Sequence, residues 1–472
     1  MEEPKAPEAP QPAPAKGKGM WIGIVVVAIV IVILLAAVFG GLLGPPAEKS
    51  LRIGTVLTLT GNSGLEAFGP KNQKGALLAV SEINAAGGVL GNPIVMVNED
   101  DGGVDSQAHD RAQKLVTTDH VDAILGATGS GKCQAVLSVA QPNQVVEISA
   151  SCTSPVFSNL SYTGGWFFRT APSDALQGVV AANYSYVNRT FRTMAVIGND
   201  NAYGRGLANV FATEFRRHGG TATVTILPEK KTSYASDLQT ILAPPMPDAV
   251  YMAEYPTDGL QIMKDWAANP PWSGVKWVFS EGLLDQTAFV DKLVQAGINP
   301  ATFEGSAPGA YLGVVGALYS DFKTRYQAAH ANEDPGLFTG NAYDAVYLLA
   351  AAAQKAGLAT PTGIKDNILA VSTPPGTAVH GGQWATILTE IAAGHDLNYE
   401  GASGALNLDK YGDPLSGYGI WGTNATNKIT TLQYFNEQTV VSMLPPSPAP
   451  PMPGTRSSAV MPTEQWRAWT RP

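Results

Sequence analysis

The chain has 472 residues, of which 45% are hydrophobic and 15% charged, and its formal net charge is -9. This length is enough for two lobes that each bury a full hydrophobic core. The acidic balance argues against a nucleic acid as partner, because nucleic-acid-binding surfaces are basic.

The N-terminal segment predicts a membrane anchor. Residues 1–20 are rich in Pro, Ala, Glu and Lys, a composition typical of disorder. The uncharged run 22–43 follows and is long enough to span a membrane, and Lys16 and Lys18 favour a cytoplasmic N-terminus. We therefore expect a disordered cytoplasmic tail over 1–20 and a transmembrane anchor over 21–44. The protein would be a single-pass protein of the cell membrane with its main domain extracellular, and a cleaved signal peptide is the alternative.

From residue 51 the sequence alternates between strand-like and helix-like periodicity. Strands are predicted at 51–59, 94–98, 121–125, 145–148, 193–198, 222–227, 249–253 and 275–280, and again at 418–422 and 429–435. Helices are predicted at 69–86, 106–118, 133–140, 174–187, 204–218, 235–242, 258–268, 316–330, 341–356 and 384–393. Two βα series of this size predict an α/β fold with two doubly wound lobes. The Pro-rich tail over 445–472 is predicted to be flexible.

The stretch 121–155 stands out within this series. Two strand-like runs there end in loops of small and hydroxyl residues, which carry Ser130 in the first loop and Ser151 and Thr153 in the second. In a parallel sheet both loops lie at the carboxyl ends of neighbouring strands, where open α/β sheets bind ligands. Bare backbone N–H groups, hydroxyls and the helix that starts just after Ser130 suit an anion such as a carboxylate.

The first loop also resembles the phosphate loop of nucleotide-binding proteins. It reads Gly126-Ala-Thr-Gly-Ser-Gly-Lys-Cys133, and Cys133 stands where that motif has the hydroxyl that holds Mg²⁺. A thiol is a poor ligand for this hard cation, and the loop follows a third strand instead of opening the fold. We therefore interpret Lys132 as a solvated lysine at a helix start and expect no enzyme, no metal and no cofactor.

The chain has two cysteines, Cys133 and Cys152, and one lies in each of the two loops. A disulfide that clamps the loops together is one interpretation, since disulfides persist outside the cell. Two buried free thiols are the other interpretation. The sequence leaves both open.

Six segments together carry a resemblance to a known family. They are LRIGTVLTLTG at 51–61, GALLAVSEINAAGG at 75–88, ISASCTSP at 148–155, FRTAPSD at 168–174, NDNAYGRG at 199–206 and YEGASG at 399–404. In this order and spacing they resemble the type I periplasmic binding proteins, specifically the branched-chain amino acid receptors of ABC importers. The resemblance covers roughly 51–436.

This resemblance implies two lobes that are joined by three crossover segments and close on a ligand. Carried over to this chain, the first lobe comprises 48–171 and 307–403. The second lobe comprises 172–306 and 404–440. The ligand would lie between the carboxyl ends of the two sheets, as the position of the small-residue loops also predicts.

The resemblance further implies contacts to the head group of an amino acid. Ser130 and Thr153 match the donors that take the carboxylate, and Ser151 matches the residue whose carbonyl takes the ammonium. Glu281 matches the acid that pairs with the ammonium. Since an α-amino acid needs anion donors and a cation acceptor at a fixed separation, this set is chemically consistent. An exposed turn before Gly282 is the alternative interpretation of Glu281.

Three aromatic residues complete the predicted ligand-binding set. Tyr203 matches a second-lobe residue that closes over the ligand, with packing at a helix start as its alternative role. Tyr255 approximates an aromatic wall of the cleft. Phe68 falls where the family has Trp or Tyr beside the ligand's side chain, although the preceding loop is about two residues longer here.

We therefore expect a membrane-anchored extracellular solute-binding protein that captures a branched-chain or similar amino acid. Its partners would be this ligand, the permease subunits of an ABC transporter, and the membrane through the N-terminal helix. A sensor of the same ligand is the alternative function. Amides, urea-like solutes and organic acids are the alternative ligands.

Overall fold

The computed structural model describes residues 49–309 and 316–445. The predicted cytoplasmic tail (1–20), the predicted anchor (21–44) and all but the first residue of the Pro-rich tail (445–472) lie outside these ranges. Within the two ranges, no helix has the length and the apolar character needed to cross a membrane.

The first sheet has five parallel strands in the order β2-β1-β3-β4-β5. The strands are β1 (Arg52–Leu57), β2 (Val95–Asp100), β3 (Ala123–Gly126), β4 (Val146–Ser149) and β5 (Phe167–Arg169). The helices between them are α2 (Gly69–Ala85), α3 (Asp105–Thr117), α4 (Ser130–Ala140) and the short α5 (Leu160–Thr163). Because all five strands are parallel, their carboxyl ends lie at one edge of the sheet.

The second sheet has seven strands in the order β15-β14-β10-β9-β8-β6-β7, in which β14 runs antiparallel to the other strands. Its strands are β6 (Thr193–Asn199), β7 (Thr221–Leu227), β8 (Ala249–Ala253), β9 (Lys276–Phe279), β10 (Glu304–Pro308), β14 (Tyr418–Thr423) and β15 (Ile429–Phe435). Its helices are α6 (Asp174–Asn183), α7 (Ala202–Arg217), α8 (Ala235–Ile241), α9 (Pro256–Ala267), α10 (Asp291–Gln295) and α15 (Glu437–Met443).

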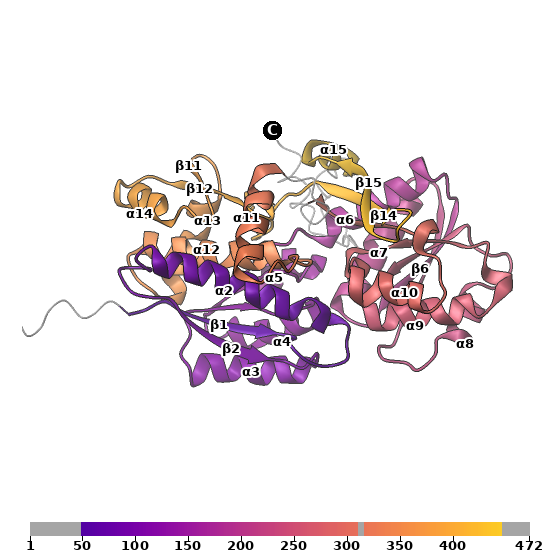
Figure 1. Cartoon of the computed structure of the whole chain (residues 1–472), viewed down its shortest axis with the longest axis horizontal. Helices are drawn as coiled ribbons and strands as arrows, with labels where there is room; N and C mark the ends of the chain where they lie inside the picture. The colour runs from indigo at the N-terminus through magenta and orange to yellow at the C-terminus, as the bar shows by residue number, and fades with distance from the viewer. Residues whose placement is uncertain (1–48, 310–315, 446–472) are drawn as a thin grey trace, which may run out of the picture. The chain divides into compact units, whose positions relative to one another are not determined.

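A third segment of the chain returns to the first sheet. Its elements are α11 (Gly316–Ala329), α12 (Thr339–Ala356), α13 (Pro361–Ser372), α14 (Trp384–Ala392) and the small sheet β11 (Thr377–His380), β12 (Leu397–Gly401) and β13 (Gly404–Ala405). The apolar helix α12 packs against α2 and α13 and reaches β3 and β4 (Figure 1). We call this segment with the first sheet the first lobe, and the second sheet with its helices the second lobe.

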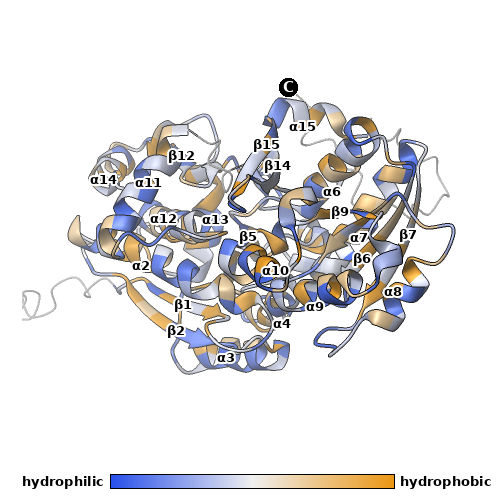
Figure 2. Ribbon diagram, turned by 45° about the vertical axis from the view of Figure 1, so that its right-hand side comes forward, coloured by the Kyte–Doolittle hydropathy of each residue, from blue (hydrophilic) through white to orange (hydrophobic). Residues whose placement is uncertain are grey.

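The hydrophobic pattern explains both cores. The central strands are buried along nearly their whole length, while helices such as α8 and α9 carry both hydrophilic and hydrophobic residues (Figure 2). This is the pattern of helices that cover a sheet with one face and meet solvent with the other. The predicted α/β fold with two doubly wound sheets is confirmed.

The structure adds elements that the periodicity did not indicate, namely β5, β10, α13 and the small sheet. β5 has three residues and β10 has five, and each pairs with neighbouring strands of its sheet. The predicted helix over 174–187 ends at Asn183, where a π-helical turn takes over. Three crossover segments connect the two lobes. The first joins β5 to α6, and the last joins β13 to β14. The middle one follows β10 and includes 310–315, which lie outside the described residues.

Candidate functional site

A small cavity lies where the carboxyl ends of strands from both lobes meet. Its lining residues are Leu65, Phe68, Thr128, Gly129, Ser151, Tyr203, Tyr255, Glu281, Gly282 and Phe338. Five of the seven predicted ligand-binding residues are in this set. The enclosed volume of about 10 Å³ holds at most about one water molecule. A solute of amino acid size therefore enters only if the lobes separate.

A much larger groove, of about 540 Å³, lies over β6 and β7. Threonines such as Thr221, Thr223 and Thr225 line it, and its one acid, Asp237, is paired with Lys231. It lies at the amino ends of these strands, away from the strand ends where open α/β sheets bind ligands. We therefore place the functional site in the small cavity between the lobes.

The two loops of the first lobe are joined to each other covalently and by hydrogen bonds. Cys133 and Cys152 form a disulfide, with an S–S distance of 1.98 Å. The hydroxyls of Ser149 and Ser151 donate to the carbonyl of Ala127 at 3.3 and 3.1 Å. This half of the site therefore has its shape before any ligand arrives.

Ser130 and Thr153 lie beside the cavity, but their hydroxyls have protein partners. The Ser130 hydroxyl accepts from the N–H of Ser154 at 3.2 Å, and the Thr153 hydroxyl donates to Asp174 at 2.9 Å. No side chain caps the start of α4 at Ser130, and no hydrogen bond within the described residues uses the N–H of Thr153. Backbone N–H groups are what these two residues offer to an anion.

Glu281 is the buried acid of the second lobe. It follows β9, is only 2% exposed, and accepts hydrogen bonds from Gln177 at 2.5 Å and from Tyr203 at 3.1 Å. The alternative of an exposed turn is therefore wrong. Burial raises the pKa of this carboxyl to about 7, against the opposing effect of the Gln177 hydrogen bond.

Asp174, which was not predicted from the sequence, is a second buried carboxyl behind Thr153. One of its oxygens accepts the Thr153 hydroxyl, and the other has no hydrogen-bond partner in the described chain. Burial and then the charge of Glu281 raise its pKa well above the usual value. Two buried carboxyls make this region favourable for a cation. The one sign of Asp174 in the sequence was its position as the last residue of FRTAPSD at 168–174, one of the six segments that carry the family resemblance.

Two aromatic rings of the second lobe line the cavity opposite the first lobe. Tyr203 and Tyr255 stack with their centroids 5.0 Å apart. Gly129 has a φ of 90°, and a Cβ there would lie 3.1 Å from the Tyr255 hydroxyl oxygen. Phe68 and Phe338, the second of which was not predicted, supply apolar walls. A ligand in this cavity would meet polar groups on one side and apolar rings on the other.

Lys132 is not the solvated lysine that the sequence suggested. It is 3% exposed, and its ammonium lies 3.2 Å from a carboxylate oxygen of Asp105. Asp105 approaches closely because Gly131 has no side chain, and a Cβ there would lie 3.1 Å from the carboxylate. The pairing leaves Lys132 poorly suited to a phosphate. In the part of the chain that the structure describes, no three His, Cys, Asp or Glu residues are grouped to hold a metal.

Comparisons with known proteins agree with this architecture. A family profile described as "Periplasmic binding protein" matches residues 50–396. The chain is 32% identical over 321 residues to the Leu/Ile/Val-binding protein BraC3 of Rhizobium johnstonii, covering 67% of this chain and 82% of the relative. It is 27% identical over 381 residues to the chemotactic signal transduction system substrate-binding protein BasB of Halobacterium salinarum, covering 79% and 86%.

The structure is also similar to that of a solved protein. This is the branched-chain amino acid transporter substrate binding protein LivJ of Streptococcus pneumoniae, crystallised in complex with isoleucine. The TM-score is 0.65 at 24% identity, and the match covers 82% of this chain and all of LivJ (100%). At 24% identity, this similarity shows that the two proteins share a fold.

Proposed function

The chain belongs to the periplasmic binding protein family, and from this premise we propose that it is a solute receptor for an α-amino acid of the branched-chain or a similar class. The observation that carries the proposal is the buried Glu281, which faces Ser151 and Gly129 of the opposite lobe across one cavity. A zwitterion bridges such a pair of surfaces, because it presents opposite charges at a fixed separation.

Each part of the amino acid has a partner in this proposal. The carboxylate accepts hydrogen bonds from the N–H groups of Ser130 and Thr153. The ammonium donates to the carboxylate of Glu281 and to the carbonyl of Ser151. Charge-assisted hydrogen bonds of this kind contribute about 1.5–3 kcal/mol each once water is excluded. The side chain lies against Phe68 and the neighbouring apolar walls. Because the ligand touches both lobes, it stabilises the state in which they are together.

The receptor's place in the cell is part of the proposal. We propose that the run 22–43 anchors it in the cell membrane, with the ligand-binding lobes outside, and that it delivers its ligand to the permease of an ABC transporter. The disulfide supports an oxidising compartment. The name of LivJ as a transporter substrate binding protein supports the delivery step.

A sensor of the same ligand is the second candidate function. It is favoured by the similarity to BasB, whose name places it in a chemotactic signal transduction system. Both functions need the same ligand-binding lobes. Stimulation of a permease by the loaded receptor would support transport, whereas a change in a signalling partner would support sensing.

Thermal-shift screening of the full chain in detergent tests the ligand class. The probes are the twenty amino acids, a set of amides and urea-like solutes, and a set of organic acids. A ligand at 100 times its Kd adds about 2.7 kcal/mol of stability. A shift with branched-chain amino acids would support the proposal. A response to organic acids alone would keep a solute receptor and contradict the pairing of Glu281 with an ammonium.

A further inference from the structure

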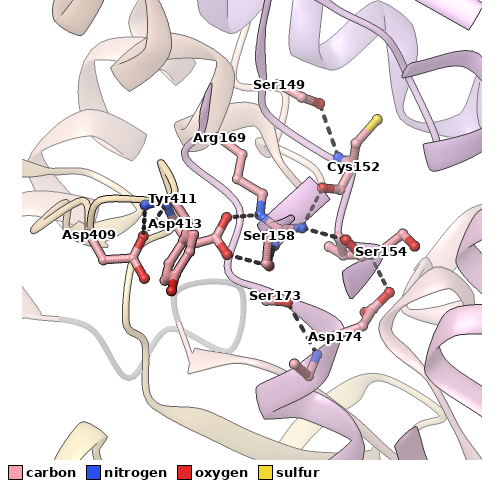
Figure 3. A network of polar contacts seen from close by, with 12 residues as sticks. Ser149, Cys152, Ser154, Ser158, Arg169, Ser173, Asp174, Asp409, Tyr411 and Asp413 are labelled. Atoms are coloured by element: carbon pink, nitrogen blue, oxygen red, sulfur yellow. Dashed lines mark hydrogen bonds and ion pairs between the residues drawn. The ribbon is translucent and has the colours of Figure 1, made fainter. Parts of the chain in front are cut away.

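Arg169, at the end of β5, has a fully buried guanidinium that does not line the cavity (Figure 3). Its Nε donates to Asp413 at 2.6 Å, and its Nη2 donates to the hydroxyl of Ser158 at 2.8 Å. Both charged side chains of the ion pair are 0% exposed. Taking such a pair out of water is costly unless every donor is satisfied.

The two N–H groups of Nη1 reach the second loop of the site. Nη1 donates to the carbonyl of Cys152 and to that of Ser154, both at 3.0 Å. These two carbonyls flank Thr153, the residue whose free N–H faces a ligand in the proposed function. The planar fork of an arginine therefore holds the backbone on both sides of this donor.

Arg169 also contacts the last crossover between the lobes, through its backbone N–H and through its ion pair. Its backbone N–H donates to the carbonyl of Gly412 at 3.0 Å, beside the ion pair with Asp413. Asp409 closes this turn by accepting from the N–H groups of Tyr411 and Asp413 at 2.8 and 3.0 Å. One residue, which directly precedes the first crossover, thus connects the second loop of the site with the last crossover.

We propose that Arg169 is a positioning residue, which sets the backbone around Thr153 and couples it to the crossover at 409–413. The inference rests on the proposed function, because the group that Arg169 positions is the N–H of Thr153, which donates to the carboxylate of the ligand there. A merely structural ion pair would need Asp413 and Ser158 alone. The two carbonyl contacts add a fixed geometry to the loop, and a lysine cannot reproduce this geometry with a single nitrogen.

The test compares Arg169→Lys with a matched control in the full chain. The control is Arg325→Lys, which perturbs a separate and partly buried arginine network of the first lobe, in which Arg325 contacts Glu82 and Tyr343. Hydrogen exchange of the ligand-free protein and calorimetric titration with L-leucine are measured for both. We expect Arg169→Lys to weaken leucine binding about tenfold or more. Faster exchange should appear at 150–155 and 409–413, and the control should change neither readout.

Ser158→Ala is the second variant, should Arg169→Lys fail to fold. It removes the hydroxyl that accepts from Arg169 Nη2 and donates to Asp413, and leaves the ion pair. We therefore expect a smaller loss of affinity and faster exchange in the same two segments. Unchanged exchange there, or unchanged leucine affinity in a folded Arg169 variant, overturns the inference and leaves the proposed function intact. If the unmodified protein binds no amino acid, the proposed function fails, and the exchange data alone decide the role of Arg169.

Discussion

The two halves of the site differ in how they are held. In the first lobe, a disulfide and serine hydroxyls fix the two loops that bring Thr128, Gly129 and Ser151 to the cavity. No ionisable side chain of that lobe is among the residues that line the cavity. In the second lobe the lining residues include Glu281, a buried acid with a raised pKa. The first half supplies a fixed geometry and the second half supplies the charge.

This difference indicates which property of the protein, stability or ligand affinity, depends on each half of the site. A rigid anion-binding loop costs little ordering when a ligand binds, since its conformational entropy has already been lost. A buried acid responds to pH and to the charge of the ligand, because its ionisation is unfavourable until a cation arrives. We therefore expect loss of the disulfide in the first half to act mainly on stability, and loss of the acid in the second half to act mainly on ligand affinity.

The largest expected effect is on the first half. Replacing Cys133 and Cys152 together by Ser should lower the free energy of unfolding by about 2–4 kcal/mol, because the clamp no longer constrains the unfolded chain. Urea unfolding under non-reducing conditions measures this change. Leucine affinity should fall less than stability does. An affinity loss with no loss of stability would reverse our division between the halves.

The next effect concerns Glu281→Gln, which keeps a hydrogen-bonding side chain and removes the charge. Affinity for an amino acid should fall about 10- to 100-fold, since a charge-assisted bond of about 1.5–3 kcal/mol is lost. The stability of the ligand-free protein should be unchanged or higher, because a buried charge is removed. Titration calorimetry measures the affinity.

Glu254→Gln is the matched control for this variant. Glu254 is 1% exposed in the same lobe and accepts from Asn199 at 2.8 Å, but it does not line the cavity. The Glu254→Gln variant should leave the affinity for the amino acid unchanged. Equal losses in the two variants would mean that the second lobe is perturbed as a whole, and Glu281 would then have no special role.

The pH dependence should separate the halves further. The pKa of Glu281 rises from 4.5 to about 7 in the ligand-free fold, so its proton stabilises the fold, and this contribution is lost as the pH rises through about 7. Ligand affinity should change in the opposite direction, rising by up to about tenfold per pH unit below 7, because the ammonium needs the ionised carboxylate. Both slopes should flatten in Glu281→Gln.

Calorimetry in two buffers of different ionisation enthalpy checks the same coupling. Near pH 6, binding of leucine should release a proton. Asp409 also has a pKa raised to about 7, by burial and then by the charge of Asp413, so part of the pH dependence of stability should remain in Glu281→Gln. Proton uptake on binding would contradict the assignment of the ammonium to Glu281.

The smallest effect is expected for Tyr255→Phe at the boundary between the halves. The ring still stacks on Tyr203, and only the hydroxyl that approaches Gly129 is lost. Affinity should change by less than about 1 kcal/mol. Calorimetry with leucine measures it. A change as large as that of Glu281→Gln would show that the hydroxyl itself binds the ligand.

The sequence by itself determined the α/β architecture and the edge of the sheets at which a site could form. Alternating periodicity marks the strands and helices, and parallel strands bring their carboxyl ends to one edge. The strand-end argument indicated Ser151, and the resemblance to the family indicated Tyr203, Tyr255 and Glu281, which line the same cavity as Ser151.

Only the tertiary structure decided how the side chains are used. The buried Lys132 is paired with Asp105 from another helix, and the Thr153 hydroxyl donates to Asp174 from beyond the first crossover. Arg169 meets Asp413 across 244 residues of sequence. Short-range patterns contain no information on such pairs, because burial and hydrogen bonding depend on which distant segments the folded chain places side by side.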